Sequence, residues 1–325
     1  MRLATWAPDL TRDGPGLLLR DIQSGKDPQI AAAVGVIRAA NADVLLLTAF
    51  DWDHEGRALQ AFSDLLAKAG MSYPHRLALR PNSGMATGID LDGDGRTGTG
   101  DDAQGFGLFT GQSGMVLLSR RPLGEVRDLS ATLWRDVPGN TMPPAPPDAA
   151  AIQRLSTTGH WDVALPAGPT TLHLLVYAAS PPVFGTGTRN LRRNHDETAF
   201  WTAYQAAGPM VVMGSANLDP VDGDGEGEAI RALIARLQDP EPRSEGGAAA
   251  PQTGSNARQK GDPALDTADW PDADGPGNLR VDYVLPDKGL KVTGSGVLWP
   301  ADGPLAETVM TASRHRLVWV NLALP

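Results

Sequence analysis

The pattern of hydrophobic positions divides the chain into short buried strands and amphipathic helices. Apolar runs rich in Val, Leu and Ile predict strands. They fall at residues 3–6, 44–48, 114–118, 171–177, 210–213, 279–285 and 317–322. Apolar residues spaced three and four positions apart predict helices between several of these strands. The helices are expected at residues 29–40, 56–69, 196–207 and 226–237.

Two of the predicted helices share a common arrangement with the strand that follows them. The segments "IAAAVGVIRAANADVLLLT" and "ETAFWTAYQAAGPMVVMGS" each contain an amphipathic helix, a short turn and a strand that is apolar on both faces. A strand that is apolar on both faces is buried from both sides. The pattern therefore predicts a layered α/β fold rather than a simple barrel.

Two segments are predicted to be long surface loops. Residues 138–150 are rich in proline, which cannot continue a sheet. Residues 239–277 are rich in Gly, Pro, Ala and Asp. Because neither segment separates two self-sufficient hydrophobic cores, we expect a single domain over residues 1–325.

Composition restricts the classes of function. A hydrophobic content of 41% is enough for a sizeable core. The chain has no cysteine, which excludes disulfides, thiolate metal ligands and a cysteine nucleophile. The net charge of −10 makes nucleic acid an unfavourable main partner, because such binding depends on phosphate neutralisation.

Targeting signals are not evident in the sequence. No apolar run approaches the roughly 20 residues that a membrane-spanning helix needs. The first residues lack the charged and apolar regions of a signal peptide. We expect a cytoplasmic protein if this is the full natural chain, and a periplasmic or secreted one if a leader has been removed.

The segment "DLDGDGRTGTGD" has the spacing of a calcium-binding loop. Its acidic residues alternate and a glycine follows at the position of the sharp turn, an arrangement that surrounds a hard cation with oxygen ligands. The predicted ligands of a structural Ca²⁺ are Asp90, Asp92, Asp94 and Asp101. The alternative is an acidic turn held by Asx hydrogen bonds. In the similar segment 219–228, Glu226 and Glu228 are expected to favour a helix N-terminus instead.

The segment "RNLRRNHDE" places Arg189, Arg192 and Arg193 in a predicted loop before a helix that begins near His195. Guanidinium groups beside a helix N-terminus suit a phosphate or a carboxylate. The alternative is that these arginines only neutralise nearby acidic loops.

Seven motifs occur in an order that resembles a known family. They are "ATWAPDL", "ADVLLLTAFDWD", "GQSGMVLLSRRPL", "LHLLVYAASPP", "VVMGSANLDP", "LRVDYVLP" and "ASRHRLVWVNL". They resemble the endonuclease/exonuclease/phosphatase family, which includes DNase I-like nucleases, sphingomyelinases and inositol phosphatases. The resemblance implies an α/β fold in which two mixed sheets pack together between helices, a four-layer sandwich. The acidic loop, "RNHDE" and "DTADWP" are similar to a bacterial branch of this family.

The resemblance also implies a reaction and the residues that perform it. In the family a divalent metal, usually Mg²⁺, polarises a phosphoester while a histidine oriented by an aspartate deprotonates water. Three implied positions are retained here, namely His315, Asp282 and Asn217. Five others are substituted, by Ala7, Ala49, Ala178, Ser215 and Arg314.

Two hypotheses follow from these substitutions. The first is an inactive or strongly impaired homologue in which the cleft binds an unknown protein or a small anionic ligand. In this hypothesis Arg314 and a loop arginine hold the anion, and the pair of His315 and Asp282 is a relic or a structural hydrogen bond.

The second hypothesis is an active phosphoesterase that uses Mg²⁺ or Mn²⁺ at a displaced site. It would act on a small phosphodiester or phosphomonoester rather than on nucleic acid. Carboxylates and a histidine close to the substituted positions would supply the site, namely Asp9, Asp51, Asp53, His54, Glu55 and Asp219.

Overall fold

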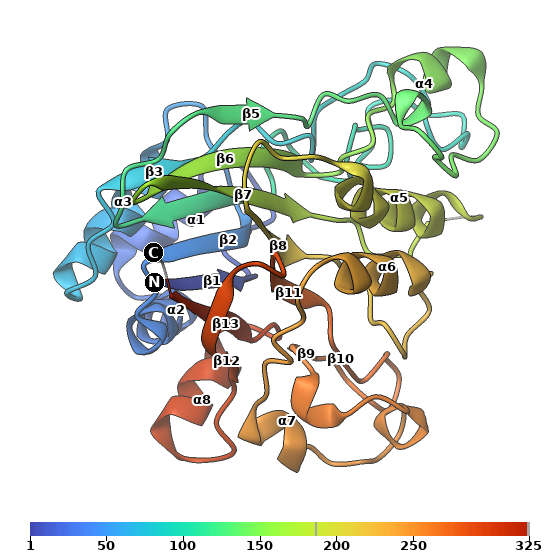
Figure 1. The fold of residues 1–325 in the computed structure, drawn as a ribbon. Coiled ribbons are helices and arrows are strands. Elements are labelled where there is room, and N and C mark those ends of the chain that lie inside the picture. The colour runs from blue at the N-terminus through green and yellow to red at the C-terminus, as the bar shows by residue number, and fades with distance from the viewer. Residues whose placement is uncertain (186, 324–325) are drawn as a thin grey trace.

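The computed structural model describes residues 1–185 and 187–323. Two mixed sheets stack face to face, and helices cover both outer faces (Figure 1). The first sheet has the order β12 (Lys291–Leu298), β13 (Leu317–Ala323), β1 (Arg2–Trp6), β2 (Val44–Phe50), β4 (Gly114–Ser119), β3 (His75–Leu77). The second has the order β11 (Asp282–Pro286), β8 (Met210–Ser215), β7 (Thr170–Ala178), β6 (Gly159–Ala167), β5 (Val126–Asp128). The implied four-layer α/β sandwich is confirmed.

The helices divide between the two outer faces. Those packed on the first sheet are α1 (Leu17–Ser24), α2 (Pro28–Ala40), α3 (Arg57–Lys68) and α8 (Gly303–Ala312). Those packed on the second sheet are α5 (Arg189–Ala203) and α6 (Glu228–Arg236). In the described ranges, 1–185 and 187–323, no helix is both long and apolar enough to cross a membrane.

Alternating side chains build separate hydrophobic cores on the two faces of each sheet. In β2, Val44 and Leu46 belong to the core between the sheets, while Leu45 and Leu47 pack against the helices of the first sheet. Strand β8 does the same on the second sheet, with Val211 between the sheets and its neighbour toward α5 and α6. Strands buried on both faces therefore follow from the apolar runs, as the sequence predicted.

The structure differs from the sequence prediction at several elements. Strand β6, "GHWDVALPA", was missed because its buried polar residues His160 and Asp162 interrupt the apolar pattern. Strand β12 was missed because it contains two glycines and is mostly half-exposed. The predicted strand 279–285 is divided into β10 (Asn278–Leu279) and β11. Helix α5 begins at Arg189 and not near residue 196, so the three arginines lie in its first turns.

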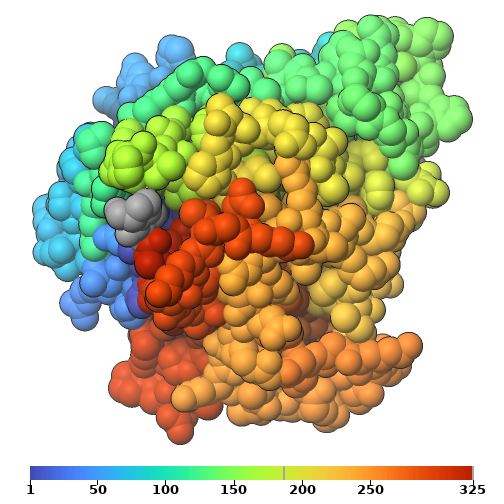
Figure 2. All heavy atoms as spheres, in the orientation of Figure 1, coloured from blue at the N-terminus to red at the C-terminus, as the bar shows by residue number. Residues whose placement is uncertain are grey.

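The two predicted surface loops contain secondary structure of their own. Residues 138–150 lead into α4 (Pro147–Ile152), which begins with proline at a position where no backbone N–H is needed. Residues 239–277 include α7 (Glu245–Ala249) and β9 (Ala268–Asp269), which pairs with β10. Figure 2 shows the orange segment around residue 250 packed as a lobe against the rest of the molecule. Because Thr267 and Ala268 are fully buried, this segment is part of the folded wall beside His315.

Candidate active site

The family positions converge on one cavity at the ends of the central strands. Ala7 directly follows β1, Ala49 lies near the end of β2, and Ala178 and Ser215 end the parallel neighbours β7 and β8. These four residues line a cavity of about 1810 Å³, together with Asn217 and His315. Of the positions that the sequence motifs assigned to one cleft, these six line the same cavity.

The retained histidine is oriented as the resemblance implied. His315 Nδ1 lies 2.8 Å from Asp282 Oδ2. Asp282 is buried, and its Oδ1 has no hydrogen-bond partner in the part of the chain that the structure describes. Trp270 packs edge-on against the imidazole with ring centroids 5.2 Å apart. Burial opposes the charged form of His315, but the charge and hydrogen bond of Asp282 outweigh it, and the pKa of His315 is raised.

Several residues that line the cleft have a left-handed backbone conformation, among them Ala49 and Asn217. Ala49 and Asn217 have positive φ angles of 53° and 49°, a conformation that alanine rarely adopts. Asn217 Nδ2 donates to Ala179 O at 2.8 Å. Strain of this kind concentrates at functional sites. Ala49 therefore holds an uncommon backbone conformation in the cleft, although its methyl group cannot bind a metal ion.

The side chains of the cleft do not fit the Mg²⁺ that the family uses. Mg²⁺ requires an octahedral set of hard oxygen ligands, with at least one or two carboxylates. Ala7, Ala49 and Ala178 present methyl groups, and Ser215 presents a hydroxyl where the family motif has a carboxylate. At the family positions themselves, the donor set therefore lacks the negative charge that holds the ion.

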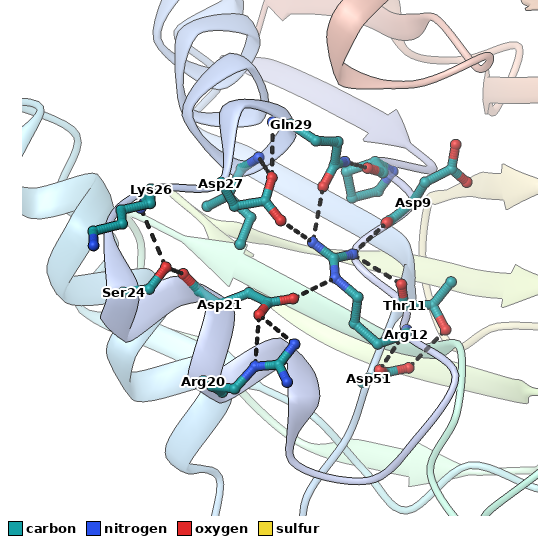
Figure 3. Close-up of polar contacts among 12 residues, drawn as sticks. Asp9, Thr11, Arg12, Arg20, Asp21, Ser24, Lys26, Asp27, Gln29 and Asp51 are labelled. Atoms are coloured by element: carbon teal, nitrogen blue, oxygen red, sulfur yellow. Dashed lines mark hydrogen bonds and ion pairs between the residues drawn. The ribbon is translucent and has the colours of Figure 1, made fainter.

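The nearby aspartate Asp51 is committed to structural hydrogen bonds. Its Oδ1 accepts from Thr11 Oγ1 at 2.7 Å and from the Ser113 backbone N–H at 3.0 Å. Its Oδ2 accepts from the Arg12 backbone N–H at 2.8 Å, and Figure 3 shows this carboxylate directed into the loop after β1. Burial raises the pKa of Asp51, although these hydrogen bonds oppose the shift. Asp51 therefore has no free oxygen pointing at a displaced metal.

The other candidate ligands for a displaced metal site either accept backbone hydrogen bonds or are exposed. Asp53 accepts from the backbone N–H groups of Arg57 and Ala58 at the start of α3. Asp219 accepts from three backbone N–H groups, those of Val221, Asp222 and Arg280. Two further residues are exposed, namely His54 against Trp52 and Glu55 paired with Arg57.

At this end of the cleft, Asp9 is the carboxylate that accepts the fewest hydrogen bonds. It is exposed, lines the cavity, and accepts one hydrogen bond from Ser313 Oγ at 2.9 Å. Arg12 fixes the loop that carries Asp9, because its guanidinium pairs with Asp21 and Asp27 at 3.0 and 2.9 Å (Figure 3). Asp9 alone would give Mg²⁺ one carboxylate ligand from the protein, the lower limit of the one or two that such sites use.

Arg314 does not face the cleft, contrary to the sequence interpretation. In the extended segment before β13, successive side chains point to opposite sides. His315 lines the cleft, whereas Arg314 is exposed and lines, together with Ser313, a separate cavity of about 670 Å³. Arg314 therefore places no positive charge at the family metal position and holds no anion there.

The three arginines of α5 have three different environments. Arg193 is buried and donates to the carbonyl oxygens of Leu155, Gln104, Arg154 and Ser156. Arg192 pairs with Glu226 at 2.7 Å. Arg189 lines the cavity, and burial lowers its pKa although neighbouring aspartates oppose the shift. Arg189 and Arg193 both line the cleft, and the amide oxygen of Gln153, in the orientation that satisfies both groups, accepts from Arg189 Nε and Nη2 at 3.0 Å.

The acidic loop lies on the rim of the same cleft. Ligand oxygens of Asp90, Asp92 and Asp102 lie within 4.8 Å of one another, so Asp102 takes the place that the sequence gave to Asp101. Asp94 and Asp101 are not in this group. Backbone hydrogen bonds are also present, since Asp90 accepts from the N–H groups of Gly93 and Gly95, and Asp102 accepts from those of Leu91 and Thr99. The second aspartate of "GDD" was the signal that the sequence reading passed over.

The comparisons with known proteins agree with this geometry. The profile of the Endonuclease/Exonuclease/phosphatase family matches residues 22–315, and the chain belongs to this family. A comparison with curated proteins found no match.

Solved structures share the fold at low sequence identity. An endonuclease/exonuclease/phosphatase from Beutenbergia cavernae has 19% identity and a TM-score of 0.57, over 100% of this chain and 71% of that one. A family protein from Leptotrichia buccalis has 14% identity and a TM-score of 0.57 over 100% of both chains. Sphingomyelinase C from Streptomyces griseocarneus has 17% identity and a TM-score of 0.50 over 98% of both chains. At these identities the similarity concerns the fold alone.

Proposed function

We propose that this family member binds a ligand in its cleft and does not hydrolyse phosphoesters at an appreciable rate. One observation carries the proposal. The positions that should supply carboxylates and a second histidine carry Ala49, Ala178 and Ser215, and the buried aspartates Asp51 and Asp219 already accept hydrogen bonds from backbone N–H groups. Loss of one member of a catalytic unit already costs several orders of magnitude in rate.

The charge of the cleft favours a particular class of ligand. Aspartates outnumber arginines in the lining, with Asp9, Asp90, Asp92, Asp101, Asp219, Asp222, Asp224 and Asp274 against Arg189, Arg193 and Arg258. A cleft lined by one sign of charge concentrates ligands of the opposite sign. We therefore favour a ligand or partner-protein segment that is neutral or cationic where it meets the rim. A small anion would depend mainly on Arg189.

The retained pair of His315 and Asp282 favours the second candidate, an active phosphoesterase with Mg²⁺ or Mn²⁺. The two functions separate in one assay of a phosphodiester, a phosphomonoester and plasmid DNA with Mg²⁺, Mn²⁺ or Ca²⁺. We expect no turnover above that of the His315→Ala variant, because the family metal has no carboxylates to hold it. Turnover in the wild type that disappears in His315→Ala would contradict the proposal and establish a displaced site.

We also propose that the loop of Asp90, Asp92 and Asp102 binds Ca²⁺ in a structural role. A ligand that binds only the native state stabilises it, by about 2.7 kcal/mol at 100 times its Kd. Chelation with EGTA is therefore expected to lower the Tm by several degrees, and added Ca²⁺ to restore it. The double variant Asp90→Asn, Asp92→Asn should lose this response. A Tm that is the same with Ca²⁺ and with EGTA would remove the calcium assignment.

A further inference from the structure

Each side chain of the motif "RNHDE" in α5 forms structural hydrogen bonds, and in the described part of the chain the atoms without a partner include the buried Asn194 Oδ1 and one nitrogen of His195. Asn194 donates to Ser180 O and Ala216 O, and Glu197 accepts from the backbone and hydroxyl groups of Thr157 and Ser180. Arg193 is saturated by carbonyl oxygens, as described above. His195 Nδ1 contacts Asp196 Oδ1 at 2.8 Å, while its Nε2 has no hydrogen-bond partner in residues 1–185 and 187–323.

The imidazole of His195 is held in a fixed orientation. Its partner Asp196 is buried and accepts from Trp134 Nε1 at 2.6 Å and from Thr141, both the backbone N–H and the hydroxyl. A histidine that donates from one ring nitrogen to an anchored carboxylate presents the other nitrogen as a metal ligand. The arrangement is that of a metal-binding histidine with its supporting carboxylate.

Two glutamates at the N-terminal end of α6 lie close to this imidazole. The ligand atoms of His195, Glu226 and Glu228 all lie within 4.8 Å of one another. Glu226 Oε1 accepts from Arg192 Nη1, which fixes its carboxylate. Its Oε2 is buried and has no partner in the described part of the chain. A buried carboxylate oxygen without a protein partner is costly unless an ion or a water molecule supplies one.

We propose that His195, Glu226 and Glu228 bind a divalent transition-metal ion of the Zn²⁺ class. One imidazole and two carboxylates suit Zn²⁺ better than Ca²⁺ or Mg²⁺, which prefer oxygen ligands alone. Zn²⁺ holds nitrogen and oxygen ligands at about 2.0–2.2 Å, so ligand atoms lie up to about 4 Å apart. The exposed side chain of Glu228 closes this distance by a small rotation. Three protein ligands leave a fourth position for water.

The bound ion would connect two elements of the cleft wall. His195 belongs to α5, and the glutamates directly follow the segment 222–225, which lines the cleft with Asp222 and Asp224. The ion would therefore fasten this segment to α5. The site differs from the acidic loop of Asp90 in its ligands and in its location, and it does not depend on the proposed function of the cleft.

Calorimetric titration of the full chain with ZnCl₂ tests the site. The protein is first stripped with EDTA and then kept in excess Ca²⁺, so that sites made of carboxylates alone are occupied. We expect one Zn²⁺ to bind per chain, with a Kd in the micromolar range. His195→Ala and Glu228→Gln should each weaken binding about tenfold or more, because even a supporting residue contributes about 10–100-fold.

The controls separate this site from others. Glu228 is exposed, so Glu228→Gln keeps the test valid even if His195→Ala unfolds. His54→Ala removes another exposed histidine and should leave the Kd unchanged. The alternative is a protonated His195 that bridges two carboxylates without a metal. Absence of saturable Zn²⁺ binding, or a Kd that stays the same in Glu228→Gln, would overturn the proposal in favour of that ion pair.

Discussion

Replacing Arg193 by methionine is expected to lower the free energy of unfolding by about 3–5 kcal/mol. Arg193 is 2% exposed, and its guanidinium donates to four backbone carbonyl oxygens. Methionine fills a similar volume but donates nothing. The variant would leave these carbonyl oxygens without a donor. It would also remove the positive charge of Arg193, which favours the charged form of buried Glu197, and an uncompensated buried carboxylate is costly.

The neighbouring Arg192 is the matched control. It is 40% exposed on its side chain and forms one ion pair, with Glu226. Arg192→Met should cost no more than about 1 kcal/mol, which is typical of exposed pairs. Urea unfolding followed by tryptophan fluorescence measures both variants. Equal, small costs in the two variants would mean that Arg193 is available to bind an anion, as the sequence suggested, and is not a structural residue.

Replacing Gly214 by alanine is expected to lower the free energy of unfolding by about 3–5 kcal/mol or to prevent folding. Gly214 has a φ angle of 147°, and a Cβ atom placed on it would lie 1.9 Å from Tyr177 O. That oxygen belongs to the backbone of β7, the parallel neighbour of β8. Removing this clash therefore requires β7 and β8 to separate, and Ser215 and Asn217 would move with β8.

Gly289→Ala is the corresponding control. Gly289 lies between β11 and β12, and a Cβ atom there would have no neighbour within 4 Å. Its substitution should change stability by less than about 0.5 kcal/mol. Thermal unfolding by circular dichroism compares the two variants under the same conditions. A Gly214→Ala protein as stable as Gly289→Ala would show that the contact between β7 and β8 relaxes easily.

The sequence by itself determined the layers of the fold and the positions that meet in the cleft. Runs such as Val44 to Leu47 can be buried on both faces only between two layers, so periodicity alone was sufficient. The order of the motifs then identified Ala49, Ser215 and His315 as neighbours, and all three line one cavity. Hydrophobic periodicity and the family motifs carry this information, because each is defined by residues that are adjacent in the chain.

Only the tertiary structure decided what the individual polar side chains do. The sequence treated Arg193 and Arg314 as one class of anion ligand, yet one is buried among carbonyl oxygens and the other faces away from the cleft. It offered Asp51 as a metal ligand, whereas Asp51 Oδ1 already accepts hydrogen bonds from Thr11 and Ser113. The proximity of His195 to Glu226 was equally hidden. Hydrogen-bond partners come from distant segments, and burial sets whether a charge is free, so neither can be read from residue order.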